Sequence, residues 1–398
     1  MKKKKNATNL IRGGLQRSNF SETSESLFLT SGFVYESAEE AEKSFKEEKE
    51  RFMYSRFGNP TVDTFQKRMA LLEGAEACWA TSSGMSALFT ILMSYLKKGD
   101  RVVSARALFG SCHYIVTEIL PKFGIEVKLV DGSDLNQWES ALKKKTKIVF
   151  FETPSNPCLE IVDITNVSTL AHKAGAKVVV DNVFATPILQ KPLELGADII
   201  MYSATKHIDG QGRVLGGAIL SDEKFCKNVI KPFIRNTGPS ISPFNAWVLL
   251  KGLETLDLRL KKQLENTKEI LEFLKKNKYI NKIYYPFDEN FSQFSLAKKQ
   301  MKGGGTILSF ELTSPKKLEK KTSFKFLNKL NLIDISNNLG DSKTLITHPD
   351  TTTHHRLSKN EKKDLGISEN LVRLSVGLEE VSDIINDIDF AIRKTYKL

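Results

Sequence analysis

The chain has 398 residues, of which 40% are hydrophobic and 27% charged, a balance typical of a folded protein with two or three structural units. Its net charge of +12 comes mainly from scattered lysines, whereas a nucleic-acid surface clusters arginine with aromatic residues. The densest apolar stretch, "ALFTILMSYL", is too short to cross a membrane. Four widely spaced cysteines without a Cys-x-x-Cys pair argue against a zinc site or a disulfide framework. "MKKKKNATNLIRGG" lacks the apolar core of a secretory signal. We therefore expect a cytoplasmic protein with neither a membrane nor a nucleic-acid partner.

The N-terminal part, residues 1–60, is predicted to be an extended polar arm with a short helix in the charged run of residues 39–51. "NPTVDTFQKRMALLEG" follows and predicts a helix that ends at Gly74, because its apolar residues recur at helical spacing. "GMSALFTILMSYLKKGD" predicts a second helix, with lysines in its last turn and Gly99 just beyond its end.

Short apolar strands then alternate with helices such as "ITNVSTLAHKAG". The predicted strands are "DRVVSA", "IEVKLVD", "KIVFFE", "AKVVVD", "ADIIMYS" and "GGAILSD". This order predicts an α/β fold with a mainly parallel sheet and helices on both of its faces, in a large domain over residues 61–255. Ligands of such sheets bind at the carboxyl ends of the strands.

The character of the chain changes near residue 256. "LDLRLKKQLENTKEILEFLKKN" predicts a long amphipathic helix, and the short strands "KIYYP", "GTILSFEL", "KTLITH" and "LVRLSVG" follow it. We therefore predict a smaller α+β domain over residues 256–398.

Three features after strand ends point to one chemistry. Asp181 closes "KVVVD", Lys206 follows "ADIIMYSAT", and "SSGMSA" opens a helix whose backbone N–H groups can hold a phosphate. A carboxylate, a lysine and an anion cradle are the groups that pyridoxal phosphate requires. Lys206 would hold the aldehyde as a Schiff base, Asp181 would keep the pyridine nitrogen protonated, and the hydroxyl groups of Ser203 and Thr205 would help to bind the phosphate. Each feature also has an ordinary structural explanation, and only their combination indicates the cofactor.

Six motifs then identify a resemblance. "YSRFGNPT", "SSGMSA", "ETPSNP", "VVVDNVFATP", "YSATKHIDGQGRVLGG" and "VRLSVGLE" stand in the order found in the Cys/Met-metabolism family of pyridoxal-phosphate enzymes, which the chain resembles from about residue 10 to its C-terminus. The resemblance implies the fold type I of these transferases, related to aspartate aminotransferase. "IDGQGR", "LFGS" and "ISNNLGDSKTLITHPDTTTHHRL" are most similar to the O-succinylhomoserine sulfhydrylases of the family.

This resemblance implies a role for each matching residue. Lys206 would carry the cofactor and shuttle a proton, and Asn156 and Arg373 would bind the substrate's α-carboxylate. Tyr54 and Arg56 would reach the cofactor phosphate of a neighbouring subunit through the N-terminal arm, in a homotetramer built as a dimer of dimers. The remaining cofactor-binding positions implied are Gly84, Met85, Phe109, Asp181, Ser203 and Thr205.

The implied reaction is a γ-replacement in methionine biosynthesis, which converts an acylated homoserine, O-succinylhomoserine, and sulfide into homocysteine and succinate. Two departures bear on this expectation. Phe109 stands where many family members have a tyrosine over the cofactor ring, and Asn338 replaces the serine of a Ser-Leu-Gly sequence. Both fit the sulfhydrylases better than the related cystathionine γ-synthases and methionine γ-lyases, which remain the alternative. The sequence leaves open the acyl group, the nucleophile and any side lyase activity.

Two other kinds of site are less well supported. A serine nucleophile elbow requires Gly-x-Ser-x-Gly, and no glycine lies two places before Ser83. The histidines His348, His354 and His355 do not predict a metal site, since adjacent histidines point apart on most backbones. We expect no bound metal.

Overall fold

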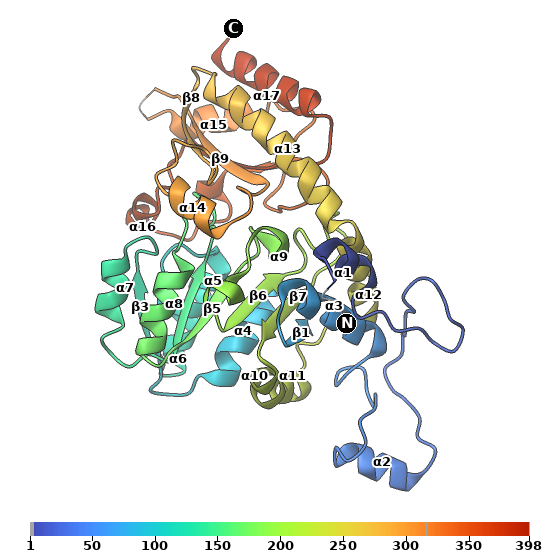
Figure 1. The fold of residues 1–398 in the computed structure, drawn as a ribbon. Coiled ribbons are helices and arrows are strands. Elements are labelled where there is room, and N and C mark those ends of the chain that lie inside the picture. The colour runs from blue at the N-terminus through green and yellow to red at the C-terminus, as the bar shows by residue number, and fades with distance from the viewer. Residues whose placement is uncertain (1–3, 316, 398) are drawn as a thin grey trace. The chain divides into compact units, whose positions relative to one another are not determined.

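The computed structural model describes residues 4–315 and 317–397, so the first three residues of the predicted arm lie outside it. Two compact units make up the chain, and Figure 1 labels their helices and strands. The first comprises the residues up to Tyr95, Met201–Thr205 and Arg213–Glu254, and the second comprises Leu96–Ile200, Lys206–Gly212 and Thr255–Leu398. The predicted boundaries at residues 60 and 255 stay a prediction.

The larger sheet has seven strands in the order β1-β7-β6-β5-β4-β2-β3. Strands β2 to β5 pair in parallel, and β1 is antiparallel to β7, which confirms the predicted α/β fold with a mainly parallel sheet. Six strands match the six predicted apolar segments. The seventh, β1, has the sequence "ACWAT", which was not predicted to be a strand. The strands are β1 (Ala77–Thr81), β2 (Arg101–Ala105), β3 (Glu126–Val130), β4 (Ile148–Glu152), β5 (Lys177–Asp181), β6 (Ile199–Ser203) and β7 (Gly217–Ser221).

In the second unit, α7 (Leu135–Ala141) and α8 (Ile164–Lys173) cover one face of β2 to β5. Val149 and Phe151 of β4 belong to the core beneath these helices. Because side chains alternate along a strand, Glu152 at the end of β4 faces the other side of the sheet. The other short helices before β6 are α5 (Gly110–Tyr114), η1 (Ile115–Ile119), α6 (Leu120–Lys122), α9 (Thr186–Leu189) and η2 (Pro192–Leu195).

The smaller sheet of the second unit has five strands in the order β10-β11-β12-β9-β8. Helices α13, α15 and α17 pack on it and share a buried apolar core with β9 and β12 (Figure 1). This core confirms a second, smaller sheet after the long amphipathic helix. Its elements are α13 (Leu256–Lys275), β8 (Ile280–Tyr284), α14 (Phe294–Gln300), β9 (Ile307–Leu312), α15 (Glu319–Leu327), β10 (Asp334–Ile335), β11 (Leu345–Thr347), η4 (Pro349–Thr351), α16 (Lys359–Asp364), β12 (Leu371–Ser375) and α17 (Val381–Tyr396).

The first unit anchors the N-terminal arm on two helices, α3 (Pro60–Glu73) and α12 (Pro243–Glu254). Fully buried Arg68 of α3 forms an ion pair with Glu25 of the arm, and Lys251 of α12 binds the same carboxylate. Beyond this anchor, α2 lies at the far end of a long loop (Figure 1). The remaining helices of this unit are α1 (Asn6–Arg12), α2 (Ala38–Phe45), α4 (Gly84–Tyr95), α10 (Glu223–Phe225), η3 (Cys226–Ile230) and α11 (Lys231–Thr237).

One prediction about a helix end is wrong. Helix α4 ends at Tyr95, so the lysines that follow are not in its last turn. The backbone N–H of Lys97 donates to the Asp100 side chain at 2.9 Å, and the N–H of Gly99 donates to the Gly124 carbonyl at 2.9 Å. These bonds offer the backbone an alternative to a further helical turn.

Across residues 4–315 and 317–397, none of the helices combines the length and the apolar character needed to cross a bilayer.

Candidate active site

Lys206 lies in the second unit, where its amine is largely buried. The Nζ atom donates a hydrogen bond of 2.6 Å to Oδ1 of Asn338. Burial, followed by the positive charge of Arg373, lowers the pKa of this amine from 10.5 to about 8. Near neutral pH, Lys206 is therefore neutral, and able to act as a nucleophile or base, far more often than a lysine with an ordinary pKa.

The loop after Lys206 is fixed by close packing. Gly210 adopts a left-handed conformation with φ +67°, and a Cβ atom there would lie 1.8 Å from Nη1 of Arg259. The same Nη1 atom donates to the backbone carbonyl of His207 at 2.9 Å. On the other side, Nε2 of His207 pairs with the Thr306 hydroxyl at 2.8 Å. Glycine is thus required where the guanidinium group approaches the backbone that carries Lys206.

Arg373 and Asn156, the predicted carboxylate-binding residues, contact each other. Nη1 of buried Arg373 donates to Oδ1 of Asn156 at 2.9 Å, and Nη2 donates to the backbone carbonyls of Asn337 and Asn338 at 3.0 and 3.2 Å. Burial lowers the pKa of Arg373 to about 10, so the guanidinium stays charged at neutral pH. Its Nε atom is buried and has no hydrogen-bond partner among the described residues. A planar guanidinium with a donor to spare suits a carboxylate.

Two carboxyl groups lie side by side at the ends of adjacent strands. Glu152 of β4 is the register partner of Asp181 of β5, and both are buried. Burial raises the pKa of both groups, and the charge of Asp181 raises that of Glu152 further. Oε2 of Glu152 accepts from the backbone N–H of Phe109 at 2.8 Å. Phe109 and Asp181 are therefore linked through a residue to which the sequence had assigned no role.

In the first unit, the start of α4 packs tightly against the end of β6. A Cβ atom on Gly84 would lie 2.6 Å from Cβ of Ser203, so only glycine lets the N-terminus of the helix come this close. Met85 is the next residue of α4. The Thr205 hydroxyl accepts from the backbone N–H of Gly216 at 3.1 Å, which fixes the segment that leads into Lys206. Of the predicted phosphate-binding positions, Gly84 and Ser203 are thus in contact at the start of α4, and Thr205 lies two residues after Ser203 in the chain.

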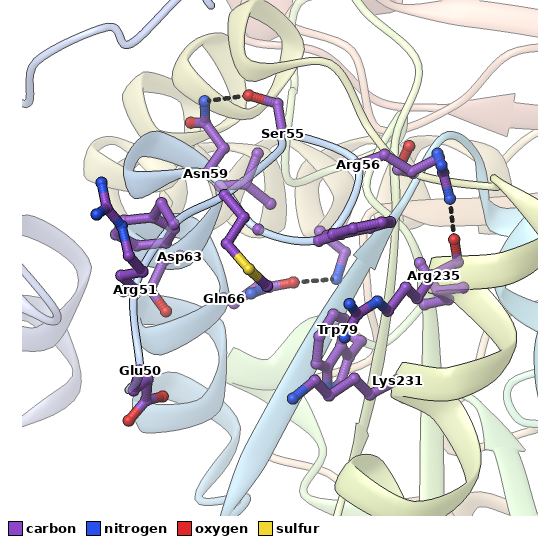
Figure 2. Close-up of a pocket in the computed structure, with 18 of the residues that line it drawn as sticks. Glu50, Arg51, Ser55, Arg56, Asn59, Asp63, Gln66, Trp79, Lys231 and Arg235 are labelled. Carbon is purple, nitrogen blue, oxygen red and sulfur yellow. Dashed lines mark hydrogen bonds between the residues drawn. The ribbon is translucent and has the colours of Figure 1, made fainter. Parts of the chain in front are cut away.

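Tyr54 and Arg56 lie on the arm, and Arg56 lines a cavity of about 730 Å³ within the first unit. Figure 2 shows Arg56 directed toward Arg235, whose backbone carbonyl accepts a hydrogen bond from Nη1 of Arg56. The guanidinium of Arg56 also lies 5.3 Å from the centre of the Tyr54 ring, and 42% of Tyr54 is exposed. Lys231 and Trp79 line the same cavity. Half-exposed Tyr54 therefore remains available to a further ligand or chain.

The two adjacent histidines of the threonine-rich loop differ in burial. His354 is buried, whereas His355 is exposed. Burial and the charge of Arg373 lower the pKa of His354 to about 3, so its imidazole is neutral. In the described part of the chain, no three His, Cys, Asp or Glu side chains are grouped so that they could hold a metal ion.

Sequence reasoning missed two contacts of this cluster. Asn338 was recognised as a departure from the family, but its bond to Lys206 joins residues 132 positions apart. Glu152 stands in the quoted motif "ETPSNP" at a strand end next to Asp181, and that position was the available signal.

The residues present fit pyridoxal phosphate. The amine of Lys206 suits the aldehyde, and the buried carboxyl of Asp181 suits a pyridine nitrogen. The glycine at position 84 brings the N–H groups at the start of a twelve-residue helix close to Ser203, as a phosphate requires.

Comparison with known proteins supports the same cofactor. Residues 7–393 match the family described as Cys/Met metabolism PLP-dependent enzymes. The chain is 53% identical, over 97% of its length and 95% of the relative, to an O-succinylhomoserine sulfhydrylase of Mycobacterium tuberculosis. It is 40% identical, over 97% of its length and 98% of the relative, to an L-methionine gamma-lyase of Fusobacterium nucleatum subsp. polymorphum.

A solved structure agrees with these relatives. The fold matches a putative O-acetylhomoserine (thiol)-lyase of Campylobacter jejuni with a TM-score of 0.92 and 31% identity, covering 98% of this chain and 100% of the other. That structure holds N'-pyridoxyl-lysine-5'-monophosphate. The chain therefore belongs to the Cys/Met-metabolism family of pyridoxal-phosphate-dependent enzymes.

Proposed function

We propose that the enzyme converts O-succinylhomoserine and sulfide into homocysteine and succinate, a γ-replacement in methionine biosynthesis. The observation that carries this choice is the 53% identity to an O-succinylhomoserine sulfhydrylase, against 40% to a methionine gamma-lyase of equal coverage. Phe109 and Asn338 support it, since neither side chain supplies the phenol or hydroxyl group found at these positions in many other members of the family.

Pyridoxal phosphate, when bound, withdraws electrons from the substrate's α-carbon, which makes the neighbouring C–H bonds acidic and lets the γ-substituent leave. Lys206 takes the α-proton and returns one at the end of the reaction. Two features suit its amine to this role: a pKa lowered to about 8, and the hydrogen bond to Asn338 that fixes its position.

Substrate binding falls to Arg373 and Asn156 in this proposal. The α-carboxylate would take the buried Nε donor of Arg373 and lie beside the Asn156 amide. A carboxylate held there also offsets part of the positive charge that lowers the pKa of Lys206. Substrate binding would thus make the amine more basic before it removes the proton.

The phosphate would be held by Gly84, Met85, Ser203 and Thr205, and Asp181 and Phe109 would contact the cofactor ring. Thr205 directly precedes Lys206, so chain connectivity links the phosphate-binding segment to the amine.

The last part of the proposal concerns contacts with a second subunit. Tyr54 and Arg56 would reach the phosphate of a neighbouring subunit, and the arm, residues 1–60, would contact that subunit in a dimer of dimers. Its solvent-exposed apolar side chains support this, because Phe20 is 91% and Val34 is 90% exposed in the single chain. Residues 61–255 and 256–398 would be the large and small domains, and the thiol state of all four cysteines fits a cytoplasmic enzyme.

Product analysis tests the reaction. Purified holoenzyme is given O-succinylhomoserine with sulfide, O-succinylhomoserine with cysteine, and methionine alone, with Lys206→Ala as the inactive control. We expect homocysteine from the first mixture at a rate well above product formation in the others. Cystathionine as the main product would assign a cystathionine γ-synthase, and methanethiol from methionine would assign a γ-lyase.

A further inference from the structure

The carboxyl group of Glu152 lies among the residues proposed to bind the cofactor and the substrate. It accepts hydrogen bonds from the backbone N–H groups of Phe109, at 2.8 Å, and of Asn156. Glu152 is only 3% exposed, so water does not replace these partners. Phe109 and Asn156 lie in loops that follow different strands, β2 and β4, and Glu152 joins both loops to the sheet.

The charges around Glu152 disfavour a second negative charge at this place. Asp181 is its register partner on β5, and Arg373 is the cation near it. Cys112 is also buried beside the two carboxyl groups. Burial and the charge of Asp181 raise the pKa of Glu152 well above its usual value, while the two N–H donors and Arg373 only partly offset this. Burial thus favours the neutral form of both carboxyl groups, and only the pKa of Glu152 is raised further by its neighbour's charge.

We propose that Glu152 is a positioning residue, which orients Phe109 over the cofactor ring and Asn156 beside the substrate carboxylate. This inference rests on the proposed roles of Phe109 and Asn156. Glu152 acts as an uncharged hydrogen-bond acceptor, so that the negative charge at this end of the site stays on Asp181. A fixed Phe109 keeps the ring plane in one orientation, and a fixed Asn156 keeps its amide oxygen on Arg373.

Three substitutions separate the contributions of shape, acceptor and charge. Glu152→Gln keeps the length and one acceptor oxygen without a charge. Glu152→Leu keeps the approximate volume but leaves two buried N–H groups without an acceptor. Glu152→Asp keeps the carboxyl group, but its shorter side chain moves that group away from the backbone N–H of Phe109. Glu311→Leu is the matched control, because Glu311 accepts from Tyr284 and Ser368 in the smaller sheet.

The measurements are the dissociation constant of pyridoxal phosphate from the resolved apoenzyme, the visible circular dichroism of the bound cofactor, and KM and kcat for O-succinylhomoserine. We expect Glu152→Gln to stay within about threefold of the wild type in cofactor affinity, with the same dichroic band. Glu152→Leu should lose about tenfold in cofactor affinity, weaken the band and raise KM. Glu152→Asp should fall between them, and Glu311→Leu should match the wild type.

Wild-type affinity and dichroism in Glu152→Leu would overturn the proposal, as would a loss in Glu152→Gln equal to that in Glu152→Leu. If Glu152→Leu does not fold, wild-type behaviour of Glu152→Asp overturns it instead. The cofactor measurements do not depend on which nucleophile or acyl ester the enzyme uses. If the enzyme catalyses a different reaction, the cofactor measurements should still give the expected results. A wrong reaction can therefore be distinguished from a wrong role for Glu152.

Discussion

The lowered pKa of Lys206 makes a quantitative prediction for how fast the apoenzyme bonds its cofactor. Only the neutral amine attacks the aldehyde. With a pKa of about 8, roughly 9% of Lys206 is neutral at pH 7, against roughly 0.03% for a lysine with a pKa of 10.5, a difference of about 300-fold. The rate of covalent capture, followed by visible absorbance, should therefore rise with pH and level off above about pH 8 to 9.

Arg373→Leu tests the electrostatic part of this reasoning. Arg373 is the second cause of the lowered pKa after burial, so its removal should raise the pKa of Lys206 by about one unit. At pH 7 the neutral fraction, and with it the capture rate, should fall about tenfold, while the plateau at high pH is retained. Arg101→Leu is the control, because Arg101 is also buried but stands at the start of β2, bonded to Glu126. A wild-type midpoint near pH 10.5, or equal midpoints in the two variants, would refute the reasoning.

Three further predictions concern the predicted phosphate-binding position Gly84, the buried His354 and the N-terminal arm. Gly84→Ala would place a Cβ atom 2.6 Å from Cβ of Ser203, so we expect equilibrium dialysis to show about tenfold weaker cofactor binding in a folded protein. His354 has a pKa of about 3 when folded and 6.5 when unfolded, so the unfolded chain binds more protons between these values and stability falls as pH drops below 6.5. His354→Gln should remove up to about 1.4 kcal/mol per pH unit from that slope in urea titrations, and an unchanged slope would contradict the assignment. Arg68→Met should lower the free energy of unfolding by about 3 kcal/mol, because it removes one of the two cations that pair with the buried carboxylate of Glu25 and leaves only Lys251. Recovery in the double variant Arg68→Met/Glu25→Gln is expected, and its absence would assign the loss to packing alone.

Local sequence patterns predicted several of the regular elements. Six apolar segments became six strands, and "NPTVDTFQKRMALLEG" became a helix that ends before Gly74, because periodicity and a terminal glycine are properties of neighbouring residues. The short strand β1 escaped prediction because "ACWAT" contains none of the Val, Ile and Leu residues that marked the other six strands. The end of α4 was wrong for a different reason: Lys97 and Gly99 take partners that periodicity cannot reveal.

The candidate site likewise has residues that motifs predict and contacts that they do not. The residue types of Asp181, Lys206 and Arg373 could be recognised from motifs, and in the structure Lys206 and Arg373 both donate hydrogen bonds to Asn338. What could not be foreseen was how these groups are held. The bond from Lys206 to Asn338 and the bond from Phe109 to Glu152 depend on the three-dimensional return of the chain, 132 and 43 residues away.

Asn338 contacts two charged groups at once. Its side-chain oxygen accepts from Lys206, and its backbone carbonyl accepts from Arg373. A few covalent bonds join these two oxygens, so the spacing between the base and the carboxylate anchor is built into the geometry of one amino acid. An altered spacing, to admit a substrate with a longer or shorter backbone, would thus require a different rotamer of Asn338 or a shift of its backbone.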